Sequence, residues 1–106
     1  MNSEIKAKTE ERIIELLKTV YDPEIPVNIY DLGLIYGIDI QDDGKLTLEM
    51  TLTAPNCPMA DFIVEDVRIR LNTIEELTDV QIKLVFEPVW SREMMSEEAM
   101  LELGLL

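Results

Sequence analysis

Two stretches of alternating apolar and polar residues, joined by a short turn, constrain the fold of this chain more than any other feature. Residues 36–41 and 46–53 each place apolar side chains at every second position, and Asp42-Asp43-Gly44 lies between them. Such a sequence is typical of a tight turn between antiparallel strands. We therefore expect a β-hairpin between Leu34 and Thr53 that is apolar on one face only and is covered there by helices. The side chains expected on the apolar face are Tyr36, Ile38, Ile40, Leu46, Leu48, Met50 and Leu52.

Helical spacing on both sides of the hairpin supplies that cover. From about residue 3 to residue 21, apolar residues recur at the i, i+3, i+4, i+7 spacing of an amphipathic helix. Asp22-Pro23 ends this helix, because a residue that precedes proline disfavours helical geometry. A second apolar stripe between Ile63 and Ile74 predicts another helix, and alternation over residues 80–86 predicts a third strand.

The order of these elements predicts an α+β fold with two layers. Helix, strand, strand, helix and strand follow one another, and the link from the second to the third strand has the size of a crossover connection. We expect a small mixed sheet covered on one face by helices. Ser96 as N-cap and Gly104 as stop predict a short C-terminal helix. No Gly/Ser-rich or Pro-rich linker divides the chain, so residues 1–106 are expected to form a single domain.

Charge and composition exclude several classes of function. Nine Lys and Arg stand against 22 Asp and Glu, which gives a net charge of -13. Nucleic acid and anionic membranes attract cationic proteins, so neither is expected as a partner. The chain has no histidine, which removes imidazole metal ligands and histidine-dependent nucleophiles. The N-terminal residues do not resemble a signal peptide and no apolar run approaches the ~20 residues of a membrane span, so we expect a cytoplasmic protein.

Cys57 is the only cysteine and the most informative single residue. It excludes an intramolecular disulfide, and it excludes a four-thiolate cluster held by one chain. Pro58 follows it, and proline is favoured at the first position of a helix, so we expect Cys57 to cap the second helix. The helix dipole there favours a thiolate, which makes Cys57 a candidate reactive group or soft metal ligand, although Asp61 opposes this by repulsion. The alternative is a buried cysteine with a packing role.

Three carboxylates, Asp22, Glu24 and Asp31, lie in the long loop that follows the first helix. Long loops in small domains have either a packing role or a functional one. In the structural interpretation, Asp22 breaks the helix, Glu24 is a solvated turn residue, and Asp31 accepts a hydrogen bond from a nearby amide.

The functional interpretation places these carboxylates near Cys57. Gly33 precedes the first strand and Thr53 follows the second, so both lie at the same end of the predicted hairpin. The loop would then return its carboxylates to the turn that carries Cys57. Oxygen and sulfur ligands suit iron or a transient cluster, but a single thiolate makes a weak site unless a second chain or a client contributes ligands.

Four ordered motifs together resemble the iron-sulfur cluster assembly domain family. They are DPEIP at 22–26, DLGLI at 31–35, TAPNCP at 53–58 and Pro-Val-Trp-Ser at 88–91, and the resemblance extends from about residue 9 to residue 104. It implies a two-layer α+β fold. It also implies a site in which Cys57 is the essential thiol, for iron or cluster handling or for contact with a client. The residues that match the motifs are Asp22, Glu24, Asp31, Gly33, Thr53 and Cys57.

The function implied by this resemblance is that of a non-enzymatic accessory factor in iron-sulfur cluster assembly or delivery to apo-proteins. Its partners would be scaffold or carrier proteins and apo-client proteins, and its cargo transient iron or a cluster that no single chain holds stably. No P-loop motif occurs, so any ATP chemistry would belong to a partner. Three alternatives stay open: a thiol-based redox or catalytic protein that uses Cys57, a plain interaction adaptor, and a homodimer that pools two Cys57 thiols.

Overall fold

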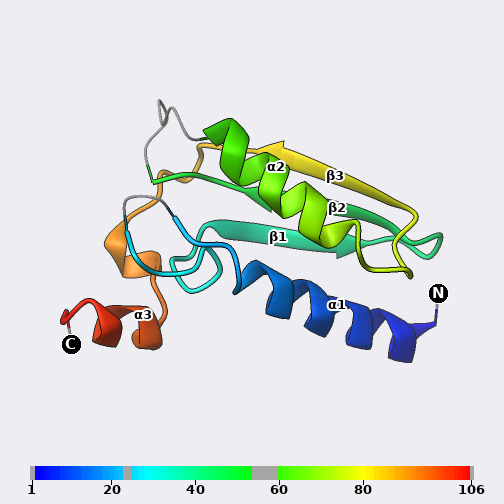
Figure 1. The fold of residues 1–106 in the computed structure, drawn as a ribbon, viewed down its shortest axis with the longest axis horizontal. Coiled ribbons are helices and arrows are strands. Elements are labelled where there is room, and N and C mark those ends of the chain that lie inside the picture. Colours follow the sequence, from blue (N-terminus) through cyan, green and yellow to red (C-terminus); the bar gives the residue numbers. More distant parts are fainter. Residues whose placement is uncertain (1, 23–24, 54–59, 106) are drawn as a thin grey trace.

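Three strands form one mixed sheet in the computed structural model, which describes residues 2–22, 25–53 and 60–105. The strands are β1 (Ile35–Ile40), β2 (Lys45–Met50) and β3 (Asp79–Leu84), and they lie in that order across the sheet (Figure 1). β1 pairs antiparallel with β2, and β3 pairs parallel with β2. The chain returns between β2 and β3 through α2 (Ala60–Leu71). The predicted hairpin, the crossover and the mixed α+β sheet are therefore confirmed.

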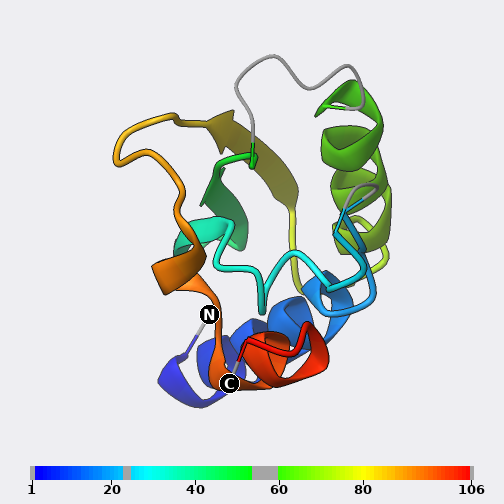
Figure 2. The ribbon, with the colours of Figure 1, turned by 90° about the vertical axis from the view of Figure 1, so that its left-hand side faces the viewer.

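Helices α1 (Ser3–Leu17) and α2 cover one face of the sheet. Figure 2 shows both on the same side of the strands, with α1 in contact with β1 and α2 in contact with β3. β2 accordingly alternates, since Leu46, Leu48 and Met50 are fully buried. On the opposite face the polar side chains of β2 and β3 line an open groove, which is formed in part by Lys45, Thr47, Glu49, Gln81 and Lys83.

The helical stripes meet this buried face. Each large apolar side chain that leaves water contributes roughly 1.5–3 kcal/mol, so the stripes are a main source of stability. None of the helices in the described part of the chain combines the length and the apolar character that a membrane span requires. The buried apolar residues that the two helices and the turn after α2 contribute are Ile13, Leu17, Ile63, Val67, Leu71 and Ile74.

The first helix ends four residues earlier than expected. α1 stops at Leu17, because the Thr19 hydroxyl donates to the Leu16 carbonyl at 2.5 Å and competes with the helical hydrogen-bond pattern. Tyr21, which was expected in the helix, instead forms an isolated antiparallel bridge with Asn28.

Tyr36 also departs from the expected pattern. A bulge between Ile35 and Gly37 interrupts the pairing of β1 with β2, and the alternation breaks at this position. Tyr36 does not take the core position that strict alternation assigns to it. Its hydroxyl donates to the carbonyl of Pro88 at 2.8 Å.

The C-terminal helix forms where the sequence predicts it. In α3 (Glu97–Glu102) the Ser96 hydroxyl accepts a hydrogen bond from the Ala99 amide at 3.1 Å, and Gly104 ends the segment with a φ of +73°. Met95 and Ala99 are buried, so α3 is anchored to the core. A short 3-10 helix, η1 (Arg92–Met94), precedes it.

Candidate functional site at one end of the sheet

The predicted site residues that the structure describes belong to one end of the molecule. There the loop between α1 and β1 (residues 18–34, the site loop), the end of β2 and the start of α2 lie together, away from the N-terminus (Figure 1). Asp22, Asp31 and Gly33 are in the site loop, and Thr53 follows β2. Cys57 and Glu24 lie outside the described residues, and so does the predicted capping of α2 by Cys57.

The site loop has a packing role of its own. Its apolar side chains form part of the core, and its backbone is cross-linked, since the Ile29 amide donates to the Val20 carbonyl at 2.8 Å. The described part of the loop is therefore packed into the core and hydrogen-bonded, and it supports the carboxylates of Asp22 and Asp31. Its fully or almost fully buried side chains are Val20, Val27, Ile29, Leu32 and Leu34.

Asp22 closes the first part of this loop. Its side chain is 6% exposed, and its Oδ1 accepts a hydrogen bond from the Ile25 amide at 3.0 Å. Its own amide donates to the Val27 carbonyl at 3.3 Å. Asp22 therefore has a local hydrogen-bonding role in the loop. The structural interpretation expected it to break the first helix, but α1 already ends at Leu17.

Asp31 closes the second part through Asn28. The Asn28 Oδ1 accepts from the Asp31 amide and the Asn28 Nδ2 donates to the Asp31 carboxylate, both at 2.8 Å. This reciprocal pair fixes a half-buried carboxylate in one orientation. The sequence interpretation missed Asn28, although an asparagine three residues before an aspartate is a recognisable signal for such a turn.

Gly33 allows the loop to pass under the C-terminal segment (residues 85–96). Its φ of +82° lies in the left-handed region, which a side chain disfavours. A Cβ at this position would also collide with the backbone carbonyl of Met94. Two independent features therefore require glycine at this position: the left-handed backbone conformation and the close approach of the Met94 backbone.

The C-terminal segment holds the site loop by further contacts that local sequence patterns do not reveal. Trp90 Nε1 donates to the buried Leu32 carbonyl at 2.7 Å, and the Ser96 amide donates to the Asp31 carbonyl at 2.8 Å. Figure 2 shows this segment descending on the side of the sheet opposite α2. Trp90 lies in a motif that carried the resemblance, but it was not among the predicted site residues.

Thr53 lies three residues after the end of β2, in a segment that meets the site loop. The Thr51 amide donates to the Leu34 carbonyl at 2.8 Å, so the segment after β2 is joined directly to the residues that follow Gly33. Thr53 is half-buried two residues further on. The structure therefore brings the Gly33 and Thr53 segments together, as the hairpin argument predicted.

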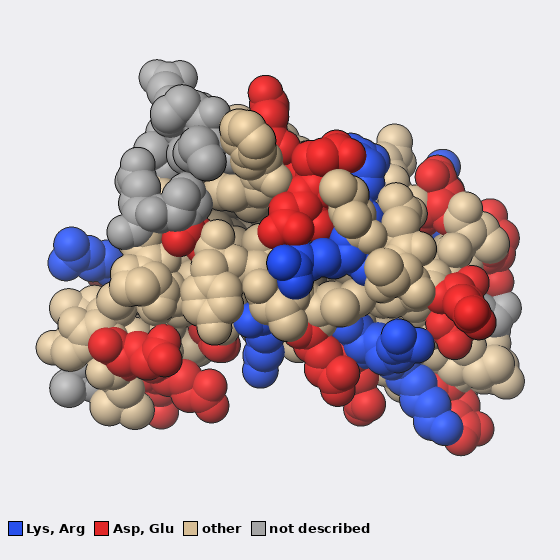
Figure 3. Space-filling view, viewed as in Figure 1, with Lys and Arg blue, Asp and Glu red and all other residues tan. Residues whose placement is uncertain are grey.

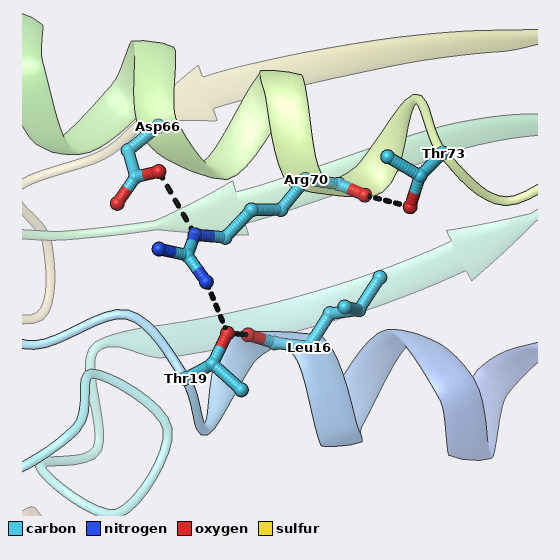
Figure 4. A network of polar contacts seen from close by, with 5 residues as sticks. All are labelled: Leu16, Thr19, Asp66, Arg70 and Thr73. Carbon is cyan, nitrogen blue, oxygen red and sulfur yellow. Dashed lines mark hydrogen bonds and ion pairs between the residues drawn. The ribbon is translucent and has the colours of Figure 1, made fainter.

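A polar network ties α2 to the start of the site loop. Arg70 Nε donates to Asp66 and Arg70 Nη1 donates to the Thr19 hydroxyl, both at 2.8 Å (Figure 4). The same Thr19 hydroxyl donates to Leu16 at the end of α1. The network therefore fixes the point at which the loop leaves α1 relative to α2.

The electrostatic character of the described surface is acidic. Figure 3 shows Asp and Glu gathered in several groups with Lys and Arg between them. Within residues 2–22, 25–53 and 60–105, no three carboxylates come together as a group that could hold a metal ion. Far from the loop, at Asp42 in the β-hairpin turn, a hydrogen bond from Lys6 lowers the carboxyl pKa.

Residues 10–84 match the model of a family described as iron-sulfur cluster assembly protein. The chain belongs to this family. The iron-sulfur cluster assembly family was the one inferred from the four motifs, and the matched range contains the first three of them.

Similar proteins from bacteria extend the family comparison along the whole chain. An Fe-S protein maturation auxiliary factor of Porphyromonas gingivalis is 61% identical over 106 residues, which is all of both chains. The factor YitW of Bacillus subtilis, which bears the same description, is 40% identical over 96 residues and is matched over 91% of this chain and 94% of its own. A crystal structure of a domain of unknown function, DUF59, from Bacillus anthracis superposes with a TM-score of 0.90 at 35% identity, covering 99% of this chain and 100% of that one.

Proposed function

We propose that this chain is a non-enzymatic accessory factor in the maturation of iron-sulfur proteins. The observation that carries the proposal is the 61% identity, over the full length of both chains, to a protein described as an Fe-S protein maturation auxiliary factor. Iron or a cluster is the cargo in this proposal and not a resident cofactor. The partners are scaffold or carrier proteins and apo-clients, and the compartment is the cytoplasm.

Within this function, Cys57 is the residue that meets the cargo or the client. A thiolate is the ligand that iron-sulfur clusters prefer, and the chain has only one cysteine. A single thiolate cannot complete the coordination of a cluster, so a partner supplies the other ligands. This sharing suits a factor that passes its cargo on.

The hydrogen bonds of the site loop support the same proposal. Asp22 and Asp31 are each held by hydrogen bonds within the loop, and the C-terminal segment holds the loop in place. We assign Asp22, Asp31 and Gly33 as positioning residues. Glu24 and Thr53 complete the proposed site as residues that contact the client or the cargo.

Cluster transfer in vitro tests the role of the thiol. The protein is incubated anaerobically with iron and sulfide, and transfer to an apo-client is followed by absorption and by the activity the client gains. Cys57→Ser replaces one sulfur atom with oxygen and should abolish the stimulation of transfer. Asn72→Ala, at the exposed end of α2, is the matched control and should behave as wild type. Full stimulation by Cys57→Ser in vitro, together with full client maturation in cells, would refute the thiol-centred proposal.

A substitution at Asp31 separates loop geometry from charge. Asp31→Asn keeps an oxygen that can accept from the Asn28 amide, but it removes the negative charge. If the carboxylate acts only as a positioning group, Asp31→Asn keeps client maturation and the melting temperature. Asn28→Ala removes both hydrogen bonds to Asp31 and should lower both client maturation and the melting temperature. Loss of maturation in Asp31→Asn at an unchanged melting temperature would show that the charge itself takes part.

A further inference from the structure

β3 is an edge strand, and no described element pairs with its outer side (Figures 1 and 2). In a parallel ladder, alternate residues direct their backbone groups toward the neighbouring strand. The Val85 amide donates to the Met50 carbonyl at 2.9 Å, so the odd-numbered residues of β3 point toward β2. The even-numbered residues point outward, in agreement with the hydrogen bond from Arg68 Nη1 to the Val80 carbonyl at 3.3 Å.

The polar face of this edge carries two opposite charges placed symmetrically about Gln81. Asp79 and Lys83 lie two residues to either side of Gln81, and all three are exposed. Each charge already faces an opposite charge on β2, because Lys45 is the register partner of Asp79 and Glu49 is the register partner of Lys83. Each cross-strand row therefore alternates in the sign of its charge, and at the open edge of β3 the row has no further neighbour among the described residues.

We propose that the edge of β3 pairs antiparallel with β3 of a second copy of this chain, in the register centred on Gln81. Gln81 then faces its own copy, and Asp79 of each chain faces Lys83 of the other. Each row of charges continues through the interface as Lys45, Asp79, Lys83 and Glu49. The outward backbone groups of Val80 and Ile82 face one another, which is the hydrogen-bonded arrangement of an antiparallel pair.

The charges select this register against its neighbours. A shift by two residues in one direction opposes Lys83 to Gln81, and a shift by four opposes Lys83 to Lys83. A shift in the other direction opposes Asp79 to Gln81. Charged side chains on an edge strand commonly prevent pairing with other chains. Here the two charges are opposite in sign and lie symmetrically about Gln81. They attract each other in the centred register, whereas in a shifted register they face an uncharged or a like-charged side chain.

Two features of the described structure are compatible with the paired edge. The Val80 carbonyl has two lone pairs, so it can accept from the partner's amide and keep its contact with Arg68. The antiparallel arrangement also sends the ends of the two β3 strands in opposite directions. The two site loops would therefore lie at opposite ends of the paired sheets.

Two single charge reversals test the register. The oligomeric state is measured by sedimentation equilibrium over a wide concentration series at about 0.15 M ionic strength, where the Debye length is about 8 Å. Wild type should shift from one chain to two as concentration rises. Lys83→Glu opposes Glu to Asp79, and Asp79→Lys opposes Lys to Lys83, so each variant alone should stay monomeric.

Mixing the two variants gives the decisive measurement. In a mixed pair, Asp79 of the first variant faces Lys83 of the second, and the two introduced charges also attract, so a heterodimer should form. Its formation also shows that both variants are folded. Lys8→Glu on α1 makes the same change in net charge as Lys83→Glu at an exposed position and should dimerise like wild type. A wild type that stays monomeric throughout, variants that still dimerise alone, or a mixture that does not assemble would each overturn the proposal. None of these results depends on the proposed role in maturation.

Discussion

Gly33 offers the sharpest test of how the site loop is held. The substitution Gly33→Ala adds a Cβ where φ is +82° and where the Met94 carbonyl occupies the space. A left-handed backbone costs a non-glycine residue about 1–2 kcal/mol. Overpacking a filled position costs about 1–3 kcal/mol more, because the neighbouring backbone has to shift. We therefore expect the free energy of unfolding to fall by about 2–5 kcal/mol.

The loss should be visible as a lower melting temperature. With about 2.1 cal/mol/K of unfolding entropy per residue, a domain of this length should melt roughly 10–20 °C lower. Circular dichroism during heating gives the measurement, and two other glycines give the controls. Gly37→Ala meets nothing closer than 3.8 Å and should change little. Gly104→Ala, where φ is +73° and nothing lies within 4 Å, isolates the cost of the backbone conformation. If Gly33→Ala and Gly37→Ala have the same melting temperature, the close approach of Met94 to Gly33 does not hold the loop in place.

Two further predictions concern single contacts. Trp90→Phe leaves the buried Leu32 carbonyl without its indole donor, so the free energy of unfolding measured with urea should fall by about 1–3 kcal/mol, and an unchanged midpoint would contradict the role given to this bond. The Asp42 carboxyl, with its pKa lowered by Lys6 at 2.8 Å, adds stability above its ordinary pKa of 3.8, and this contribution is lost as the pH falls through the lowered value. Lys6→Met should raise the Asp42 pKa toward 3.8 in an NMR titration and remove this part of the acid dependence, whereas an unmoved pKa would assign the shift to another cause.

The elements confirmed by the structure are those whose signals are local. The hairpin turn, the buried stripe of α2 and the cap of α3 each depend on residues within about two helical turns or strand repeats of one another. The end of α1 was placed four residues too late, because the Thr19 hydroxyl competes for a helical carbonyl and the apolar spacing does not report this. The core position expected for Tyr36 was wrong for a different reason. The bulge in the pairing of β1 with β2 interrupts the alternation, and the hydroxyl of Tyr36 donates to Pro88, 52 residues away.

The candidate site divides in the same way. Asp22 and Asp31 could be singled out from the sequence, and the turn partner of Asp31, Asn28, was within reach of a local pattern. The reason that Gly33 must be glycine could not be read locally, because Met94 approaches it only in the complete fold. The hydrogen bond from Trp90 to Leu32 joins residues 58 positions apart and depends on the same arrangement.

The hydrogen bonds from the C-terminal segment to the site loop affect the order in which a newly synthesised chain can fold. Synthesis proceeds from the N-terminus, so the loop emerges from the ribosome long before Trp90 and Ser96. The sheet can close once β3 has emerged, but the loop gains its last hydrogen-bond donors only when residue 96 follows. A chain that ends after β3 would therefore contain the three strands of the sheet, but its site loop would lack the hydrogen bonds from Trp90 and Ser96. The loop that carries the proposed site is thus completed after the sheet that supports it.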